Sequence, residues 1–285
     1  MKQISQYLAT AQQQLIQTLK LEASTAGIEA QSLLRVVLPT ATRAWLITHG
    51  DDSLSVEQQT TFDALLKRRL NGEPVAYIVG IRDFYGFEFK VSPEVLIPRA
   101  DTETLVETAL AKIPIEQPCE VLDMGTGTGA IAITIALLRP QAQVIAIDIS
   151  PTALQIAREN MHNLAANNLI LLQSDWFSGL NGERFDVIVS NPPYIADQDM
   201  HLTQGDLRFE PLQALASGKD GLDSICHIIT GAPQYLNPHG WLMLEHGYDQ
   251  AEQVQRLLFA AGFSEVVSTP DLAGILRVTA GKKQS

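Results

Sequence analysis

The first part of the chain carries apolar residues at helical spacing. From residue 1 to about residue 72 they recur every three or four positions, and no segment alternates apolar and polar residues as a strand does. The turn-forming segment Asn71-Gly72-Glu73-Pro74 closes this region. The spacing predicts a small helical bundle over residues 1–72, with apolar positions that include Tyr7, Leu8, Ala11, Leu15, Leu33, Leu34, Val37 and Leu38.

A short strand-like pattern follows the predicted bundle. Tyr77 to Val79 and Phe84 to Val91 are rich in aromatic and β-branched residues, and they flank Arg82-Asp83. Gly86 interrupts the second run. We expect two short strands around Arg82-Asp83, which would form a β-hairpin linker over residues 73–98.

From Glu120 onward, apolar runs of strand length alternate with helical patterns. Helices are expected to open at Thr128, Pro151 and Gly221, and a further helix is expected from Tyr248 to Ala261. This alternation predicts an α/β fold with a doubly wound, mostly parallel sheet in a domain of residues 99–285. The expected strands are Glu120 to Asp123, Gln143 to Asp148, Leu169 to Ser174, Phe185 to Ser190 and Trp241 to Glu245, followed by a hairpin of Glu265 to Thr269 and Ile275 to Thr279.

Composition indicates an ordinary cytoplasmic protein. The chain has 285 residues, 46% of them hydrophobic, which is enough for one large core or two smaller ones. The apolar run Ile131 to Leu138 is too short to span a bilayer, and Met1 to Leu15 has no apolar signal core. Cys119 and Cys226 have no paired spacing, so we expect no disulfide and no metal site.

The charge is uneven along the chain. Residues 1–75 hold seven Lys or Arg and seven Asp or Glu, so the whole net charge of −12 lies in residues 76–285. Affinity for nucleic acid comes largely from Lys and Arg that neutralise phosphates, and the longest basic run is Lys67-Arg68-Arg69. An acidic second half therefore disfavours stable nucleic-acid binding.

Glycines at the end of the first strand predict a nucleotide-type cofactor site. Val121 to Ala130 contains a strand, a glycine loop and the start of a helix, and glycine allows sharp turns and close approach to a ligand. The loop also satisfies the dinucleotide fingerprint, so an NAD-dependent dehydrogenase or a non-catalytic nucleotide-binding module is an alternative. In either case Asp148, at the end of the next strand, would bind ribose hydroxyls.

Three strand ends favour S-adenosylmethionine over a dinucleotide. Asp123 precedes the first glycine by two residues, where a carboxylate suits a cationic sulfonium. Trp176, after the third strand, offers a ring for an adenine, and the fourth strand ends in a polar loop. The candidate cofactor-binding residues are Asp123, Gly125, Thr126, Gly127, Thr128, Gly129, Asp148, Trp176 and Asn191.

The polar loop is Asn191-Pro192-Pro193-Tyr194, which indicates a site for methylating a planar nitrogen. The lone pair of an amide or exocyclic amine is delocalised, so it must be held toward an electrophile. The Asn191 side-chain oxygen and the Pro192 carbonyl can accept the two N–H groups, while Tyr194 offers an aromatic face. We expect Asn191, Pro192 and Tyr194 to be catalytic and Asn191 to Tyr194 to contact the acceptor.

These motifs in this order resemble class I S-adenosylmethionine-dependent methyltransferases. Further motifs resemble the peptide chain release factor glutamine methyltransferases, the HemK-like family, over nearly the whole chain: Ile97-Pro98-Arg99-Ala100-Asp101-Thr102-Glu103, Phe209-Glu210-Pro211, Ala214-Leu215, Asp220-Gly221-Leu222 and Leu244-Glu245-His246-Gly247. The resemblance implies a seven-stranded sheet and transfer of a methyl group to the glutamine N5 of a Gly-Gly-Gln motif. It also implies substrate contacts at Arg99 and Glu103.

Two positions depart from the family pattern. Ala100 and Asp101 replace the usual Pro and Glu, which leaves the roles around them open, and His246 stands where an apolar residue is common. Two alternative acceptors share the predicted site: the glutamine of a ribosomal protein, and the adenine of DNA, which the acidic charge disfavours. We expect a monomer, with residues 1–72 acting as the substrate-recognition domain.

Overall fold

The computed structural model describes residues 3–285. The chain divides into two compact units, Met1–Ile81 and Arg82–Ser285. Each unit has its own hydrophobic core, so each is described separately.

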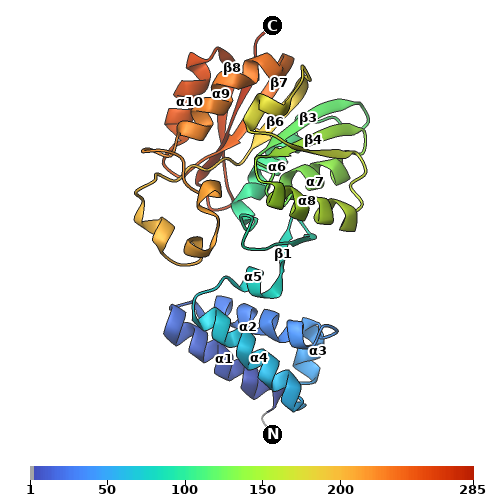
Figure 1. The fold of residues 1–285 in the computed structure, drawn as a ribbon, viewed down its shortest axis with the longest axis vertical. Helices are drawn as coiled ribbons and strands as arrows, with labels where there is room; N and C mark the ends of the chain where they lie inside the picture. The colour runs from blue at the N-terminus through green and yellow to red at the C-terminus, as the bar shows by residue number, and fades with distance from the viewer. Residues whose placement is uncertain (1–2) are drawn as a thin grey trace. The chain divides into compact units, whose positions relative to one another are not determined.

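The first unit is helical, as the apolar spacing predicts (Figure 1). Its core gathers residues that the sequence spaces three or four apart, such as Ala11 with Leu15 and Ala30 with Leu33 and Leu34. The buried Arg69 guanidinium donates to both Glu29 oxygens, at 2.7 and 3.1 Å, so the one charge neutralises the other. The helices are α1 (Ile4–Leu19), α2 (Ala23–Val37), α3 (Arg43–Thr48), α4 (Val56–Leu70) and α5 (Val75–Val79).

The expected strand at Tyr77 to Val79 is wrong, because this segment belongs to α5. Tyr77 and Ile78 are buried, and the burial that a helical turn gives them outweighs the strand preference of the β-branched residues around them. The hairpin itself forms later, from β1 (Ile81–Phe84) and β2 (Phe87–Lys90). Its turn is Tyr85-Gly86, both with positive φ, and not Arg82-Asp83.

The second unit contains a seven-stranded sheet in the order β5-β4-β3-β6-β7-β9-β8. The pairs β5–β4, β4–β3, β3–β6 and β6–β7 are parallel, whereas β9 pairs antiparallel with both β7 and β8. The predicted mostly parallel, doubly wound sheet is confirmed. Its strands are β3 (Cys119–Met124), β4 (Ala142–Asp148), β5 (Leu169–Gln173), β6 (Phe185–Ser190), β7 (Leu236–Glu245), β8 (Phe263–Pro270) and β9 (Leu276–Lys283).

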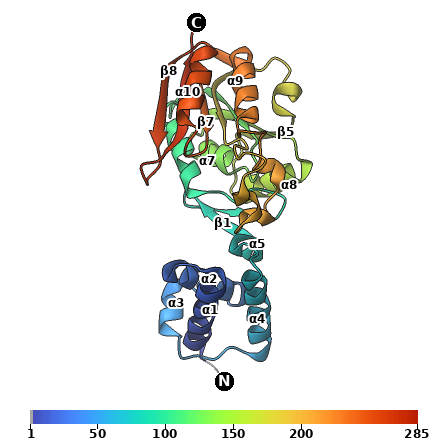
Figure 2. The ribbon, with the colours of Figure 1, turned by 90° about the vertical axis from the view of Figure 1, so that its left-hand side faces the viewer.

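Helices cover both faces of this sheet (Figure 2). Neighbouring residues of β3 point to opposite sides: Val121 joins a core with α6 and α7, and Leu122 joins a core with α9 and α10. Strands buried on both faces explain the continuous apolar runs in the sequence. The helices are α6 (Glu103–Leu110), α7 (Ala130–Leu138), α8 (Pro151–Asn163), α9 (Asp223–Tyr235) and α10 (Ala251–Ala260), with 3₁₀ turns η1 (Ala100–Thr102), η2 (Trp176–Gly179), η3 (Met200–Thr203), η4 (Leu207–Phe209) and η5 (Leu212–Ala214).

The strand order reverses direction between β3 and β6. These two strands are neighbours in the sheet although β4 and β5 separate them in the sequence. Connections leave the two strands toward opposite faces at such a point, which opens a crevice at their carboxyl ends. The glycine loop follows β3 and the Asn191-Pro192-Pro193-Tyr194 loop follows β6, so both are brought to this crevice.

Candidate active site

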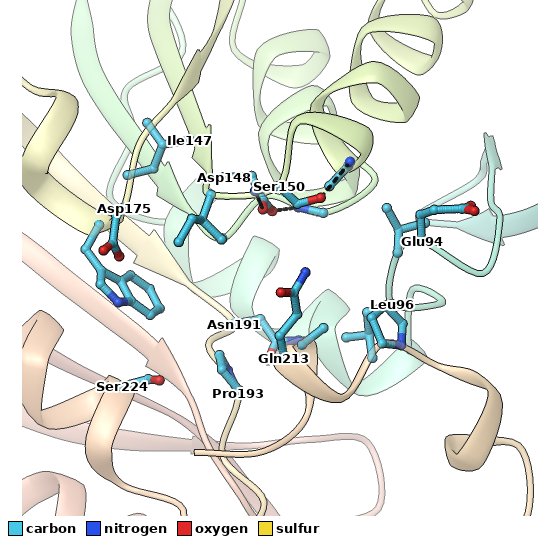
Figure 3. Close-up of a pocket in the computed structure, with 18 of the residues that line it drawn as sticks. Glu94, Leu96, Ile147, Asp148, Ser150, Asp175, Asn191, Pro193, Gln213 and Ser224 are labelled. Atoms are coloured by element: carbon cyan, nitrogen blue, oxygen red, sulfur yellow. Dashed lines mark hydrogen bonds between the residues drawn. The ribbon is translucent and has the colours of Figure 1, made fainter. Parts of the chain in front are cut away.

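A cavity of about 350 Å³ lies at the carboxyl ends of β3, β4, β5 and β6. Figure 3 shows Asp148 and Ser150 on one side of it, Asn191 and Pro193 facing them, and Glu94 and Leu96 on a third side. Further parts of the wall come from the glycine loop, from Ser174 to Trp176, from Pro211, Gln213, Ala214 and Ala216, and from Ser224. Four strand ends therefore supply the polar groups, and two loops enclose them.

Glycine is required at the loop after β3 for two different reasons. Gly125, Gly127 and Gly129 all have positive φ, at 74°, 54° and 82°. A Cβ atom on Gly125 or Gly127 would meet no protein atom within 4 Å, and both residues line the cavity, so their open side is available to a ligand. A Cβ atom on Gly129 would lie 2.8 Å from Cδ1 of Ile133, so this glycine serves the packing of α7.

Asp148 holds the glycine loop and faces the cavity. Its Oδ2 accepts a hydrogen bond from the Gly127 amide at 2.9 Å, and its Oδ1 accepts one from the Ser150 amide at 2.9 Å. Burial raises the pKa of this carboxyl, while these backbone amides lower it. A carboxylate has about four acceptor positions, so the Ser150, Gly127 and Ile149 amides leave at least one for a ligand hydroxyl.

Asp123 lies at the end of β3 and is fully buried. Its Oδ2 accepts from the Thr126 hydroxyl at 2.7 Å, but its Oδ1 has no hydrogen-bond partner within residues 3–285. Burial raises the pKa of Asp123 to about 7, and the Thr126 hydroxyl offsets part of that effect. Asp123 does not line the cavity, but its buried carboxyl, when ionised, favours a cationic ligand near the glycine loop.

Trp176 lines the cavity in a strained backbone conformation. Its φ is 48°, in the left-handed region that disfavours a bulky residue. Ser174 supports this turn: its hydroxyl donates to the Trp176 carbonyl and accepts from the Gly179 amide at 2.8 Å. The backbone that follows β5 is thereby held so that Asp175 and Trp176 both face the cavity.

Asn191 lines the cavity at the end of β6. Its Nδ2 donates to the Thr102 hydroxyl oxygen at 3.1 Å, and Thr102 is a buried residue of η1. With the amide nitrogen engaged there, the side-chain oxygen Oδ1 remains for the cavity. Pro193 also lines the cavity, whereas Pro192 is buried in the loop.

Tyr194 does not line the cavity. Its ring packs against the core that contains α9 and α10, and its hydroxyl donates to Oε1 of the buried Glu245 at 3.3 Å. Its backbone carbonyl accepts from Nε2 of Gln250 at 3.0 Å. These contacts fix the end of the Asn191 to Tyr194 loop.

Arg99 and Glu103 do not line the cavity. The Arg99 guanidinium pairs with the buried Glu210, whose Oε2 also accepts from the Ile97 amide at 3.2 Å. This pair joins the segment after Leu96 to the segment before Pro211, and both segments form cavity walls. Glu103 accepts from the Tyr85 amide at 3.0 Å and so fixes the hairpin turn.

The structure thus groups six of the predicted site residues around one cavity, namely Gly125, Gly127, Asp148, Trp176, Asn191 and Pro193. The sequence interpretation gave no role to Glu94, Leu96, Gln213 and Ser224, which complete its wall. Gln213 follows the Phe209-Glu210-Pro211 motif, which was the available signal for this wall. His246 is a core residue whose ring bridges the Gly247 carbonyl and the Thr279 hydroxyl, at 2.9 and 2.8 Å.

Comparisons with known proteins place this chain in a family. A family described as a methyltransferase domain matches residues 115–270, and one described as the PrmC N-terminal domain matches residues 7–80. A release factor glutamine methyltransferase of Xylella fastidiosa (strain 9a5c) is 50% identical over 265 residues, which cover 92% of this chain and 96% of the relative. The chain belongs to the release factor glutamine methyltransferase family. The family resemblance seen in the motifs is confirmed.

Further relatives support the same assignment. The enzyme of that description from Escherichia coli (strain K12) is 49% identical over 240 residues, covering 84% of this chain and 86% of the relative. Among solved structures, a methyltransferase from Pyrococcus furiosus superposes with a TM-score of 0.54 at 19% identity and covers 77% of this chain and 98% of its own. That similarity confirms the class I methyltransferase fold.

Within residues 3–285, no helix is both long and apolar enough to cross a membrane. No group of three or more His, Cys, Asp or Glu side chains in that range is arranged to hold a metal ion.

Proposed function

We propose that this protein transfers a methyl group from S-adenosylmethionine to the side-chain amide nitrogen, N5, of the glutamine in the Gly-Gly-Gln motif of peptide chain release factors. The observation that carries the proposal is the placement of Asn191. Its amide nitrogen is bonded to Thr102, and its oxygen is left to the cavity. An acceptor-only group at that point suits an incoming NH₂ group.

The residues around the cavity fit the cofactor. Asp148 would accept the ribose hydroxyls, Trp176 would contact the adenine, and the glycine loop would allow close approach to the remainder. The buried Asp123 carboxyl, when ionised, favours the cationic end of the cofactor. When bound, S-adenosylmethionine supplies an electrophilic methyl group on a positively charged sulfur.

The chain's own contribution is to position and desolvate the acceptor. Asn191 Oδ1 and the Pro192 carbonyl would accept the two N–H groups of the glutamine amide, which turns the nitrogen lone pair toward the methyl group. Pro192 and Pro193 stiffen the loop because their φ angles are fixed. Formation of the new N–C bond is balanced by loss of one N–H proton from the methylated amide.

Selection of one glutamine needs a second contact surface, because every glutamine side chain presents the same amide. We assign that role to the helical unit, which exposes Ile28 and Ile47. The variant Ile28→Asp/Ile47→Asp is expected to methylate the intact factor less efficiently and a short Gly-Gly-Gln peptide normally. Gln14→Asp/Gln17→Asp makes the same charge change on exposed helical positions and serves as the matched control. If both variants methylated the intact factor equally well, the helical unit would not have this role.

The proposal includes a cytoplasmic location, where release factors act.

The deciding experiment incubates the protein with S-adenosylmethionine labelled in the methyl group and with separate acceptors. The acceptors are a release factor, the same factor with its Gly-Gly-Gln glutamine changed to alanine, ribosomal proteins and DNA. Label is expected on the unchanged release factor only. Label on ribosomal protein or DNA in place of the factor would refute the proposed substrate, and protection by NAD in place of S-adenosylmethionine in a thermal-shift measurement would refute the cofactor.

A further inference from the structure

An exposed apolar turn, residues 272–276, lies at the junction of β8 and β9. All five residues are exposed and none is charged, although the second unit carries the whole net charge of −12. Leu272 is fully exposed, and Ile275 and Leu276 are 39% and 38% exposed. Apolar residues that are exposed in a run, and not singly, indicate a surface that another molecule covers.

The apolar turn has a fixed backbone, because the buried Asp271 holds it. Oδ1 of Asp271 accepts hydrogen bonds from the Ala273 and Ile275 amides, at 2.9 and 3.0 Å. The Asp271 amide donates to the Ile275 carbonyl at 2.8 Å, and Oδ2 accepts from Nε of Arg277 at 3.0 Å. The apolar side chains are therefore presented by a preorganised turn, and a partner that docks there has little backbone to order.

The direction of the strands places the apolar turn at the same edge of the sheet as the cavity. β9 is antiparallel to both β7 and β8, so β8 runs in the same direction as β7, which is parallel to β6. The carboxyl end of β8, where the apolar turn begins, thus shares an edge with the carboxyl ends that surround the cavity (Figure 2).

Arg277 links the apolar turn to the segment beside the cavity. Besides its bond to Asp271, its Nη2 lies 3.3 Å from Oδ2 of Asp101, which belongs to η1. The next residue of η1, Thr102, accepts the hydrogen bond from Nδ2 of Asn191, and Asn191 lines the cavity. Direct side-chain contacts therefore run from the apolar turn through η1 to the residue that would hold the acceptor amide.

We propose that the apolar turn is a docking surface for the protein substrate, which contacts Leu272 and Ile275 while its glutamine occupies the cavity. The inference rests on the proposed methyl transfer and adds a contact from the catalytic unit to the one assigned to the helical unit. Asp271 and Arg277, which flank the turn, pair with each other. The turn thus offers apolar contact and no free charge, so it fits an apolar patch beside the acceptor glutamine.

The test compares substitutions at two exposed apolar positions. Leu272→Asp and Leu272→Lys place a charge of either sign on the apolar turn. Ile115→Asp is the matched control, because Ile115 is 65% exposed and precedes β3, at the opposite edge of the sheet. For each variant, kcat and KM are measured with the intact release factor and with a short Gly-Gly-Gln peptide. The dissociation constant of S-adenosylmethionine and the Tm are measured as well.

Both Leu272 variants are expected to lower kcat/KM for the intact factor by roughly 10- to 100-fold, mainly through KM, as loss of one buried leucine contact does. The kinetics with the peptide, the cofactor dissociation constant and the Tm should stay unchanged, and Ile115→Asp should match the unaltered protein. A loss with only one sign of charge would show repulsion in place of apolar contact. That result, an equal loss with the peptide, or normal kcat/KM in both variants would overturn the inference.

Photo-crosslinking gives a direct measurement of the contact. A benzophenone amino acid at position 272 is expected to crosslink to the purified release factor, whereas the same group at position 115 is not. No crosslink to the factor from position 272, or crosslinks only between copies of this chain together with a dimer in sedimentation, would overturn the inference. Failure of the unaltered protein to label the release factor would instead refute the proposed function.

Discussion

Gly221 gives the sharpest test of how the Asn191 to Tyr194 loop is supported. It precedes α9, has φ of 78°, and packs against the back of the loop. A Cβ atom at this position would lie 2.2 Å from the Tyr194 carbonyl oxygen and 2.8 Å from Nε2 of Gln250, which donates to the same carbonyl. Gly221→Ala therefore changes the site without touching the cavity.

The structure sets the size of the effect. Ordinary contact begins at 3.4 Å, so the Tyr194 backbone must retreat by about 1.2 Å. An alanine at positive φ costs about 1–2 kcal/mol in unfolding free energy, and the forced shift adds about 1–3 kcal/mol. A displacement of about 1 Å near the reacting groups lowers turnover by about 100-fold. The sum of these two costs is smaller than the unfolding free energy of an ordinary domain, so the variant is expected to stay folded.

The assay needs a control that separates strain from displacement. Gly262 has a similar φ of 85°, and a Cβ atom there would meet nothing within 4 Å. Gly262→Ala should lower the unfolding free energy by about 1–2 kcal/mol and leave kcat unchanged. Urea denaturation and methylation of the release factor are measured for both variants. If Gly221→Ala were no less stable than Gly262→Ala and kept normal turnover, the argument from the Tyr194 contact would be wrong.

Three further predictions concern the cavity itself. Asp148→Ala should weaken binding of S-adenosylmethionine by about 10- to 100-fold in calorimetry, because two charge-assisted hydrogen bonds to the ribose are lost; unchanged affinity in a folded variant would contradict this role. Asn191→Ala should lower kcat by roughly 100- to 1,000-fold with little change in Tm, and near-normal turnover would move the acceptor pocket elsewhere. The pKa of Asp123 is raised to about 7 in the folded protein. Between about pH 4 and 7 the folded state therefore holds a proton that the unfolded chain has lost, and the unfolding free energy falls as the pH rises. Asp123→Asn should therefore be more stable than the unaltered cofactor-free protein by on the order of a few kcal/mol at pH 8, with the difference shrinking toward pH 4 in chemical denaturation; a difference independent of pH would exclude the raised pKa.

The elements whose bounds were predicted correctly are those whose apolar pattern fits only one type of secondary structure. β6 was expected at its observed bounds, because a strand buried on both faces is a continuous apolar run. α5 was missed because Val75 and Val79 favour strands locally, and only tertiary burial makes a helix of this segment. The η turns between Met200 and Ala214 are too short to give a periodic signal.

The residues of the site also divide into those that could be identified from the sequence and those that could not. Residues whose type carries chemistry, such as Asp148 and Asn191, could be named from the sequence because they sit at strand ends. Thr102, Glu210 and Glu245 could not, since their roles come from contacts with partners 51 to 111 positions away. A sequence motif marks such residues but does not say what they touch.

The position of β9 sets an order for assembly of the second unit. β8 is made before β9, but in the sheet β9 lies between β8 and β7 and pairs with both. While the chain is being synthesised, β8 therefore has no strand of the sheet to pair with until β9 emerges, and β7 keeps an open edge during that interval. The parallel strands that carry the cavity need no such delay, because each strand after β3 pairs with a strand that has already been made. The antiparallel border of the sheet is then the last part to close, and any loss of β9 would release β8 with it.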